Sequence, residues 1–217
     1  MNIEIVNSID KIKTSKRELT LQIFVVFILP IFLINFGLLA LKYRSAMLIS
    51  LVTILVSIVI TEKWTPSMLG FDLHRIKKYI LPYMVFTILG ILVATTFGEQ
   101  MGREELDKWW QYNHFIYGFF IVSLFQEIAY RGYLVPALGK LISRPIYILI
   151  ANAILFTFLH SIFPNPIIGL PLAMIGGLGF AYMYMKYPSL ILITLSHALI
   201  NFFVVLYGFF AIPGVTY

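Results

Sequence analysis

The stretch that decides the fold reads GFFIVSLFQEIAYRGYLVP and covers Gly118–Pro136. It is apolar and long enough to cross a bilayer as a helix, yet it carries Glu127 and, four residues later, Arg131. Of the ten acidic residues in the chain, only Glu127 lies deep inside a hydrophobic segment. A charge at the centre of a membrane helix costs about 2.5–3.5 kcal/mol on insertion scales, and more when it is unpaired. Because leucine would hold the fold better, Glu127 is the first candidate for a functional residue.

Apolar runs recur along the whole chain of 217 residues, which is 60% hydrophobic with a mean hydropathy of +0.90. This composition excludes a soluble globular domain. Runs of about 20 apolar residues span a membrane as helices, and they lack the alternation of a membrane barrel. The predicted spans are Leu19–Leu41, Ala46–Thr61, Tyr79–Phe97, His114–Val135, Pro145–Phe163, Ile167–Met185 and Ser189–Phe210. We therefore predict an all-α, polytopic helical membrane protein with about seven transmembrane helices (six to eight) in a single domain over residues 1–217.

The charged residues follow the positive-inside pattern, so the net charge of +6 does not indicate nucleic-acid binding. With the N-terminus inside, twelve basic residues fall in cytoplasmic segments and four outside. The inner set is Lys11, Lys13, Lys16, Arg17, Lys63, Arg75, Lys77, Lys78, Arg131, Lys140, Arg144 and Lys186, and the outer set is Lys42, Arg44, Arg103 and Lys108. We expect an integral membrane protein with a cytoplasmic N-terminus. Its compact size and lack of organelle signals favour a prokaryotic plasma membrane.

Other sequence features limit the chemistry and the topology. The absence of cysteine excludes disulfides, thiolate catalysis and cysteine-ligated metal sites. The polar first 18 residues precede a full-length span without a small-residue cleavage site, so we expect an uncleaved first helix. Met68–Lys78 fits either an amphipathic surface segment or a basic anchoring loop. Gly98–Tyr112 is the most polar connection, and its tryptophans should mark the start of the fourth span. Small residues spaced by four around Gly177 predict a tight helix-packing seam.

Three later spans carry residue pairs separated by four positions. The pairs are Glu127 and Arg131, with Ser123 and Tyr130 near their face, then Phe156 and His160, and finally His197 and Asn201. Residues four apart share one face of a helix, and polar side chains in lipid turn inward and pair. Three separate helices should therefore direct these groups into a common interior.

The chemistry of this set is that of hydrolysis. A glutamate beside an imidazole can take a proton from water and make the water nucleophilic. A histidine N–H and an asparagine amide are suitable donors to a developing oxyanion. Together they describe acyl-transfer hydrolysis inside the membrane. Arg131 could neutralise Glu127 or hold its rotamer, and an ordinary buried ion pair is the alternative interpretation.

The three pairs, in this order on successive spans, resemble the signatures of the CAAX protease and bacteriocin-processing family. This family is also called Abi and includes the type II CAAX prenyl endopeptidases. The resemblance covers roughly Phe119–Phe203, within a core over 113–210. It implies a metal-free, glutamate-dependent intramembrane endopeptidase acting on a membrane-associated protein or peptide. Glu127 and His160 would activate water, and His197 and Asn201 would stabilise the oxyanion, with Arg131, Gln126 and Phe156 as supporting residues.

One position departs from the family pattern. The family signature usually opens with two adjacent glutamates, of which the first is often assigned as the base, and here that position is Gln126. Glutamine cannot act as a base. Either Glu127 takes the role from a direction rotated by about 100° around the helix, or the chain has lost proteolysis and kept a binding function.

Other functions compete with a glutamate peptidase. Glu127, His160 and His197 form a two-histidine, one-carboxylate set that zinc accepts, although no HExxH helix is present. A serine mechanism would need Ser123, Ser161 or Ser196 beside a histidine. Gln126 keeps open a different class of function, a non-catalytic membrane partner such as an immunity protein that binds a bacteriocin receptor. A proton-coupled transporter using Glu127 lacks internal repeats and ranks last.

Overall fold

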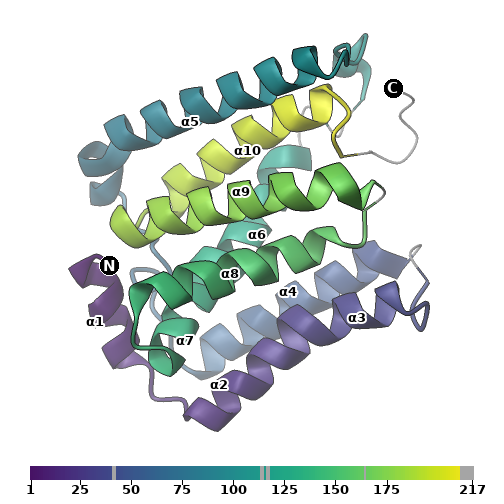
Figure 1. Cartoon of the computed structure of the whole chain (residues 1–217). Coiled ribbons are helices and arrows are strands. Elements are labelled where there is room, and N and C mark those ends of the chain that lie inside the picture. Colours follow the sequence, from purple (N-terminus) through teal and green to yellow (C-terminus); the bar gives the residue numbers. More distant parts are fainter. Residues whose placement is uncertain (41–42, 113–114, 116–117, 164, 211–217) are drawn as a thin grey trace.

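The computed structural model (Figure 1) describes residues 1–40, 43–112, 115, 118–163 and 165–210, with the backbone alone for residues 3 and 44–48. In these residues every regular element is a helix, so the predicted all-α fold is confirmed. The elements are α1 (Ile3–Lys11), α2 (Lys16–Ile23), η1 (Phe24–Ile28), α3 (Leu29–Asn35), α4 (Arg44–Thr61), α5 (His74–Gln100), η3 (Trp109–Gln111), α6 (Phe119–Glu127), η5 (Ile128–Tyr133), α7 (Leu134–Leu141), α8 (Pro145–His160), α9 (Pro166–Lys186) and α10 (Leu190–Leu206). Here η1 and η5 are π-helical turns and η3 is a 3₁₀ turn.

Each of the seven predicted spans coincides with a helix or with a continuous run of helices in the described part of the chain. Three of them, at Lys16–Asn35, His74–Gln100 and Pro166–Lys186, are long and apolar enough to cross a membrane. Shorter apolar helices run over Ile49–Thr61, Pro145–His160 and Leu190–Leu206. Because long apolar helices repeat in this way, the chain is a polytopic helical membrane protein.

Two predicted boundaries differ from the structure more than the others. The first span ends at Asn35, because Gly37 takes a left-handed φ of 71° and turns the chain. The fourth span continues to Leu141. Pro136 does not end it, because the π-helical turn η5 has already interrupted the regular backbone ladder just before this proline. The predicted positions Leu41, Lys42, His114 and Pro164 lie outside the described residues.

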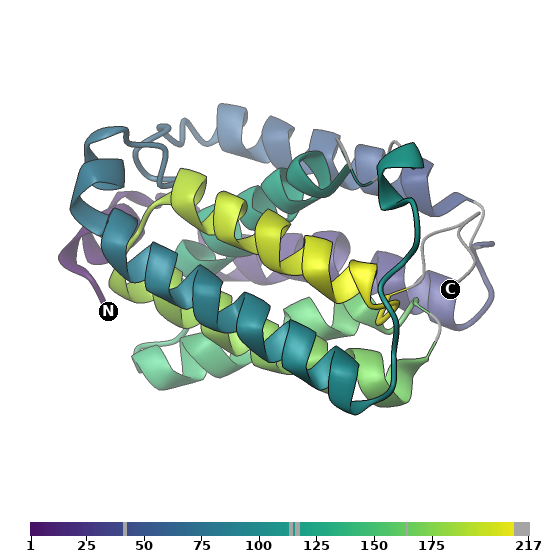
Figure 2. The same cartoon turned by 90° about the horizontal axis from the view of Figure 1, so that it is seen from above.

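The C-terminal helices form the packing centre of the molecule. Helix α10 packs against α5 and α6, while α8 packs against α9 and α7, and Figures 1 and 2 show α10 and α5 side by side in both views. The opposite face of α5 exposes large apolar side chains, among them Leu81 (68%) and Val93 (62%). An apolar surface of this kind is suited to contact with lipid rather than water.

The N-terminal segment forms a docked helix that the sequence analysis did not predict. In α1, the buried side chains Ile5 and Ile9 lie on one helical face, Ile12 just after the helix is also buried, and α1 packs against α7. The Glu4 carboxylate lies 3.1 Å from Nε of Arg75 at the start of α5. Arg75 is buried, whereas Leu73 in the same segment is exposed, so the choice between the two interpretations of Met68–Lys78 stays a prediction.

Helices α8 and α9 approach closely at Gly177, which confirms the predicted small-residue seam. A Cβ atom added there would lie 3.1 Å from the Phe156 ring and 3.2 Å from Cα of Ala153. Ala173 and Ala181, one turn on either side, are both buried. The close approach brings the α9 backbone beside the second residue pair.

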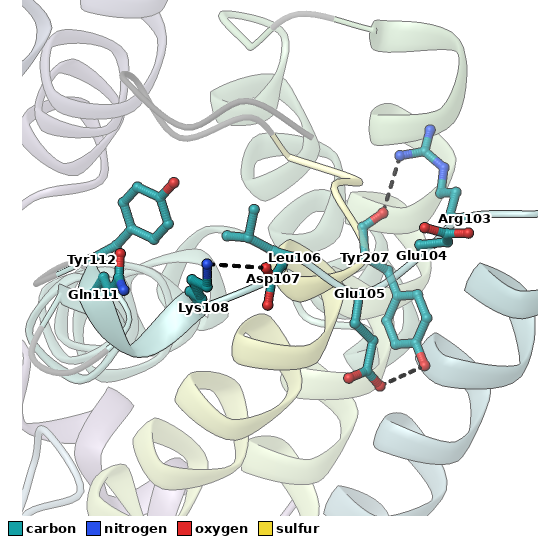
Figure 3. Close-up of a pocket in the computed structure, with 9 residues that line it drawn as sticks. All are labelled: Arg103, Glu104, Glu105, Leu106, Asp107, Lys108, Gln111, Tyr112 and Tyr207. Carbon is teal, nitrogen blue, oxygen red and sulfur yellow. Dashed lines mark hydrogen bonds and ion pairs between the residues drawn. The ribbon is translucent and has the colours of Figure 1, made fainter.

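The polar connection after α5 crosses the end of α10 and then turns toward α6. Its backbone is fixed by the Leu106 N–H, which donates to the Leu206 carbonyl at 2.9 Å. Arg103 donates to the Tyr207 and Gly208 carbonyls, and the Tyr207 hydroxyl donates to Glu105. A cavity of about 540 Å³ opens here (Figure 3). Its side chains are of both charges, and no residue of the three pairs lines it among the described residues.

The predicted sides of the membrane correspond to the two ends of the structure. In Figures 1 and 2 the start of α5 lies at the end nearest the N-terminus, and the segment between α5 and α6 lies at the other end. Arg131 is a correction to the charge count, because it is fully buried inside the protein and not in a cytoplasmic segment. Without Arg131, eleven basic residues on the predicted inner side still outnumber the four on the outer side. Which end faces the cytoplasm stays a prediction.

Candidate functional site

The site begins where α6 ends and the backbone widens into a π-helical turn. Glu127 is the last residue of α6, and Arg131 lies within η5. Single π-helical turns inside α-helices occur frequently at functional sites, because they shift side chains relative to the regular helical spacing. Both side chains are fully buried. The structure therefore places the first pair in the interior, as the sequence predicted.

The two oxygens of the Glu127 carboxylate have different surroundings. Oε1 accepts a hydrogen bond from Nη1 of Arg131 at 3.0 Å and lies 2.6 Å from Nδ1 of His197. Oε2 is buried and has no hydrogen-bond partner among the described residues. Oε1 is thus held by two groups from two helices, whereas Oε2 is left without a hydrogen-bond donor in the described part of the chain.

Arg131 connects the carboxylate to α9 and to two aromatic rings. Its Nη2 donates to the Gly177 carbonyl at 3.3 Å. Its guanidinium carbon lies 4.5 Å from the Phe156 ring centre and 5.4 Å from that of Phe180. A buried charge is tolerated only with good partners, and stacking on aromatic faces adds to the attraction. The predicted Glu127–Arg131 pair is therefore an ion pair held by three helical segments.

The second pair meets the other two through the Phe156 ring. Phe156 lies 4.7 Å from the His160 ring and 5.7 Å from the His197 ring, measured between ring centres. His160 is 8% exposed, and its Nδ1 lies 2.8 Å from the Phe156 carbonyl. Because a carbonyl only accepts hydrogen bonds, this contact assigns the proton of a neutral His160 to Nδ1 and leaves Nε2 as an acceptor.

Asn201 is the residue that the structure ties least firmly to the others. It lies one turn beyond His197 on α10 and is half-buried. Its side chain makes no hydrogen bond with the described residues. The amide is thus near the site along α10 and available to a ligand.

Gln126 faces away from the Glu127–His197 contact. It lines an apolar cavity of about 520 Å³ between α4, α6 and the η1–α3 segment, and its Oε1 is buried without a partner in the described structure. The other lining residues include Phe27, Leu55, Val122 and Leu159, the last of which precedes His160. Adjacent helical residues point about 100° apart. Gln126 therefore faces the apolar cavity, while Glu127 faces His197.

Two residues of α9 complete the site, and sequence reasoning missed their roles. The His197 ring stacks on Phe180 at 4.5 Å with an angle of 31°, and the Gly177 carbonyl accepts from Arg131. The spacing of small residues predicted Gly177 only as part of a packing seam. Phe180 follows Gly177 by three positions and so shares its face, which was the available signal that α9 also contributes to the site.

The serines beside the histidines are engaged elsewhere. Ser161 donates to the Phe158 carbonyl and accepts from Asn35. The Ser196 hydroxyl lies 2.7 Å from that of Thr87 on α5. Neither contact joins a serine to a histidine, so the geometry gives no support to a serine nucleophile at these positions.

The zinc alternative requires three ligands in one place. Glu127 and His197 are in contact, but the described residues contain no group of three or more histidine, cysteine, aspartate or glutamate side chains able to hold one metal ion. His160 contacts the Phe156 ring and its own helix backbone instead. In this conformation the donor set does not fit zinc.

Comparison with known families places the site within one matched segment. Residues 108–203 match the family described as type II CAAX prenyl endopeptidase, Rce1-like. This segment is Rce1-like. The match includes all three residue pairs and confirms the predicted resemblance to the CAAX protease family. No curated protein and no solved structure matches the chain. The Rce1-like match indicates, in general terms, a protease and a membrane protein.

Proposed function

We propose that the protein is an intramembrane endopeptidase that hydrolyses a peptide bond of a membrane-associated protein or peptide. The observation that carries this proposal is the Glu127 carboxylate, which has one oxygen fixed by Arg131 and His197 and the other without a partner. A base that has one oxygen held and the other without a hydrogen-bond partner is suited to proton transfer. The Rce1-like match over 108–203 supplies the reaction class.

In the proposed reaction, Oε2 of Glu127 accepts a proton from a water molecule while the water oxygen bonds to the peptide carbonyl carbon. The carbonyl oxygen becomes an oxyanion. The C–N bond then breaks as the proton passes from Glu127 to the leaving amine, which gives a carboxylic acid and an amine. Arg131 holds Glu127 in one rotamer through its contact with Oε1. We propose that this mechanism needs no metal ion or other cofactor.

The remaining residues take the roles that the resemblance implies. His160 presents Nε2 as a second proton acceptor, because its Nδ1 is used by its own helix. Asn201 offers an unengaged amide to the oxyanion, one turn from His197. The contact of His197 Nδ1 with Glu127 orients the imidazole, and the resemblance implies that His197 helps to stabilise the oxyanion.

The apolar cavity beside Gln126 suggests how a lipid-modified substrate could be accommodated. Its lining is almost entirely aliphatic and aromatic, and it lies within the predicted membrane spans. A prenyl chain, which the family description implies, fits such a surface. Because Glu127 and His197 are buried, α6 and α10 must separate before a peptide reaches them. We place the protein in a prokaryotic plasma membrane with its N-terminus in the cytoplasm.

A panel of variants in proteoliposomes tests the proposal. The reporter is a fluorogenic peptide that ends in a prenylated CAAX sequence, compared with its unprenylated form. Glu127→Gln, His160→Ala and His197→Ala should each abolish cleavage while the purified protein remains folded. Asn201→Ala should lower the rate by about 10²–10³, the cost of one oxyanion donor. Full activity in Glu127→Gln would eliminate the glutamate mechanism.

A binding protein derived from such a protease is the second candidate, and two observations favour it. Gln126 stands where the family usually has a glutamate, and none of the four proposed catalytic residues lines either large cavity in the described structure. Under this alternative the wild type cleaves no peptide. The cellular phenotype would then persist in Glu127→Gln and in His197→Ala, whereas the peptidase proposal requires that it disappear in both.

A further inference from the structure

Two buried hydroxyl side chains in the described helices, Ser123 in α6 and Thr194 in α10, have no hydrogen-bond partner, and Ser123 is the one that lies on the helix of Glu127. A serine or threonine within a helix commonly bonds to the carbonyl four residues earlier. The residues that do so here are Ser8, Thr20, Thr53, Ser57, Thr61, Thr87 and Thr157. Ser123 is fully buried in α6, and its Oγ has no hydrogen-bond partner among the described residues. Its hydroxyl therefore does not make the bond to its own helix that the other residues make.

The Glu127 carboxylate, on the same face of the helix, also has a buried oxygen without a hydrogen-bond partner among the described residues. Ser123 precedes Glu127 by one helical turn, and both Ser123 Oγ and Glu127 Oε2 are buried without a partner in the described structure. Residues separated by four positions have their Cβ atoms about 5–6 Å apart. At this Cβ separation the two side chains need not bond to each other directly, and one water molecule can bridge them.

Helix α10 defines what lies opposite these two atoms. Glu127 contacts His197 at 2.6 Å, and Phe119, two turns earlier on α6, has its ring centre 6.1 Å from that of Phe202. The two helices therefore run antiparallel, and Ser123 lies between these two contacts. The stretch of α10 at this level includes Asn201, whose amide is unengaged.

We propose that Ser123 Oγ and Glu127 Oε2 form a water-binding site at the seam between α6 and α10. A hydroxyl buried without a hydrogen bond costs about 1–3 kcal/mol, and internal waters typically satisfy such groups with about three hydrogen bonds. The water donates one hydrogen to Oε2 of Glu127 and bonds to the Ser123 hydroxyl. Its oxygen lone pair is thereby directed toward α10, where a substrate carbonyl would be polarised by Asn201.

The role of this water as the nucleophile rests on the proposed peptidase function, whereas the water site itself does not. That water gives its proton to Glu127 and its oxygen to the peptide carbonyl carbon, and the proton leaves with the amine. Ser123 forms no bond to the substrate. It is a positioning residue that holds the water in line with the carbonyl, so its loss should affect kcat and leave KM unchanged.

The first test does not depend on catalysis. A high-resolution density map of the wild type should contain a water within hydrogen-bonding distance of both Ser123 Oγ and Glu127 Oε2. The same map of Ser123→Ala should lack that water or show it displaced. A map in which the Ser123 hydroxyl bonds to the Phe119 carbonyl, with no water beside Glu127, would overturn the proposal even if the protein is a peptidase.

The second test uses the peptide reporter in proteoliposomes. Ser123→Ala should lower kcat by about 10–100-fold with KM unchanged, within the range for a group that assists proton transfer. Thr157→Val is the matched control, because the Thr157 hydroxyl is already bonded to the Ala153 carbonyl, and its kcat should match the wild type. Equal losses in both variants would show a packing effect and refute the positioning role. An inactive wild type with the water present would refute the peptidase proposal while leaving the water site established.

Discussion

Replacing Arg131 with methionine tests the energetics of the site. The guanidinium is fully buried, contacts Oε1 of Glu127 at 3.0 Å and donates to the Gly177 carbonyl at 3.3 Å. Removing one partner of a buried ion pair typically costs 3–5 kcal/mol, because the remaining charge is left unpaired. Methionine keeps most of the apolar contact with the Phe156 ring. We therefore expect Arg131→Met to lower the free energy of unfolding by about 3–5 kcal/mol.

The double variant separates the ion pair from packing. In Glu127→Gln combined with Arg131→Met, no charge remains to be left unpaired, so part of the loss should be recovered. The difference from the sum of the single variants should be about 1–3 kcal/mol. Reversible unfolding in mixed micelles, followed by circular dichroism during an SDS titration, measures all three. Arg144→Met, at an exposed position, is the control and should stay within about 0.5 kcal/mol of the wild type. Strict additivity of the two single losses would refute the coupling.

Three further predictions follow from the packing, the charge distribution and the donor set. Gly177→Ala should destabilise the protein by about 1–3 kcal/mol, because its Cβ would lie 3.1 Å from Phe156, whereas Gly176→Ala, with its nearest contact at 3.5 Å, should be tolerated in the same SDS titration. In this cysteine-free chain, Glu105→Cys should react with an impermeant thiol reagent only from outside the cell and Lys140→Cys only from inside; labelling of position 105 from inside would overturn the topology. A strong chelator should leave peptide cleavage unchanged, and reversible inhibition with recovery on adding zinc would make Glu127 a ligand instead.

The sequence identified the residues of the site better than it identified their partners. A spacing of four on apolar spans was enough to predict that Glu127 and Arg131 share a face, and the structure has them 3.0 Å apart. Periodicity assigns a residue to a face of its own helix but says nothing about which helix lies opposite. For that reason the roles of Gly177 and Phe180 were missed, although both lie on the predicted packing helix.

The pattern of apolar and polar residues also could not predict local irregularities of the backbone. The π-helical turn η5 lies within an apolar span, and no residue type in it specifies a widened turn. The docking of α1 had a signal in the spacing of Ile5, Ile9 and Ile12, which mixed charges obscured. The 100° rotation between Gln126 and Glu127 was expected. The cavity beside Gln126 was not, because it forms between α6 and segments distant in the sequence.

The central claim is that Glu127 is the base of a membrane peptidase although Gln126 replaces the usual first glutamate. The most direct measurement compares cells that produce the wild type, Glu127→Gln or Gln126→Ala, and identifies new peptide termini in their membrane proteins by mass spectrometry. We predict cleavage sites in the wild type, the same sites at reduced abundance with Gln126→Ala, and none with Glu127→Gln. Identical termini in the wild type and Glu127→Gln cells would contradict the account.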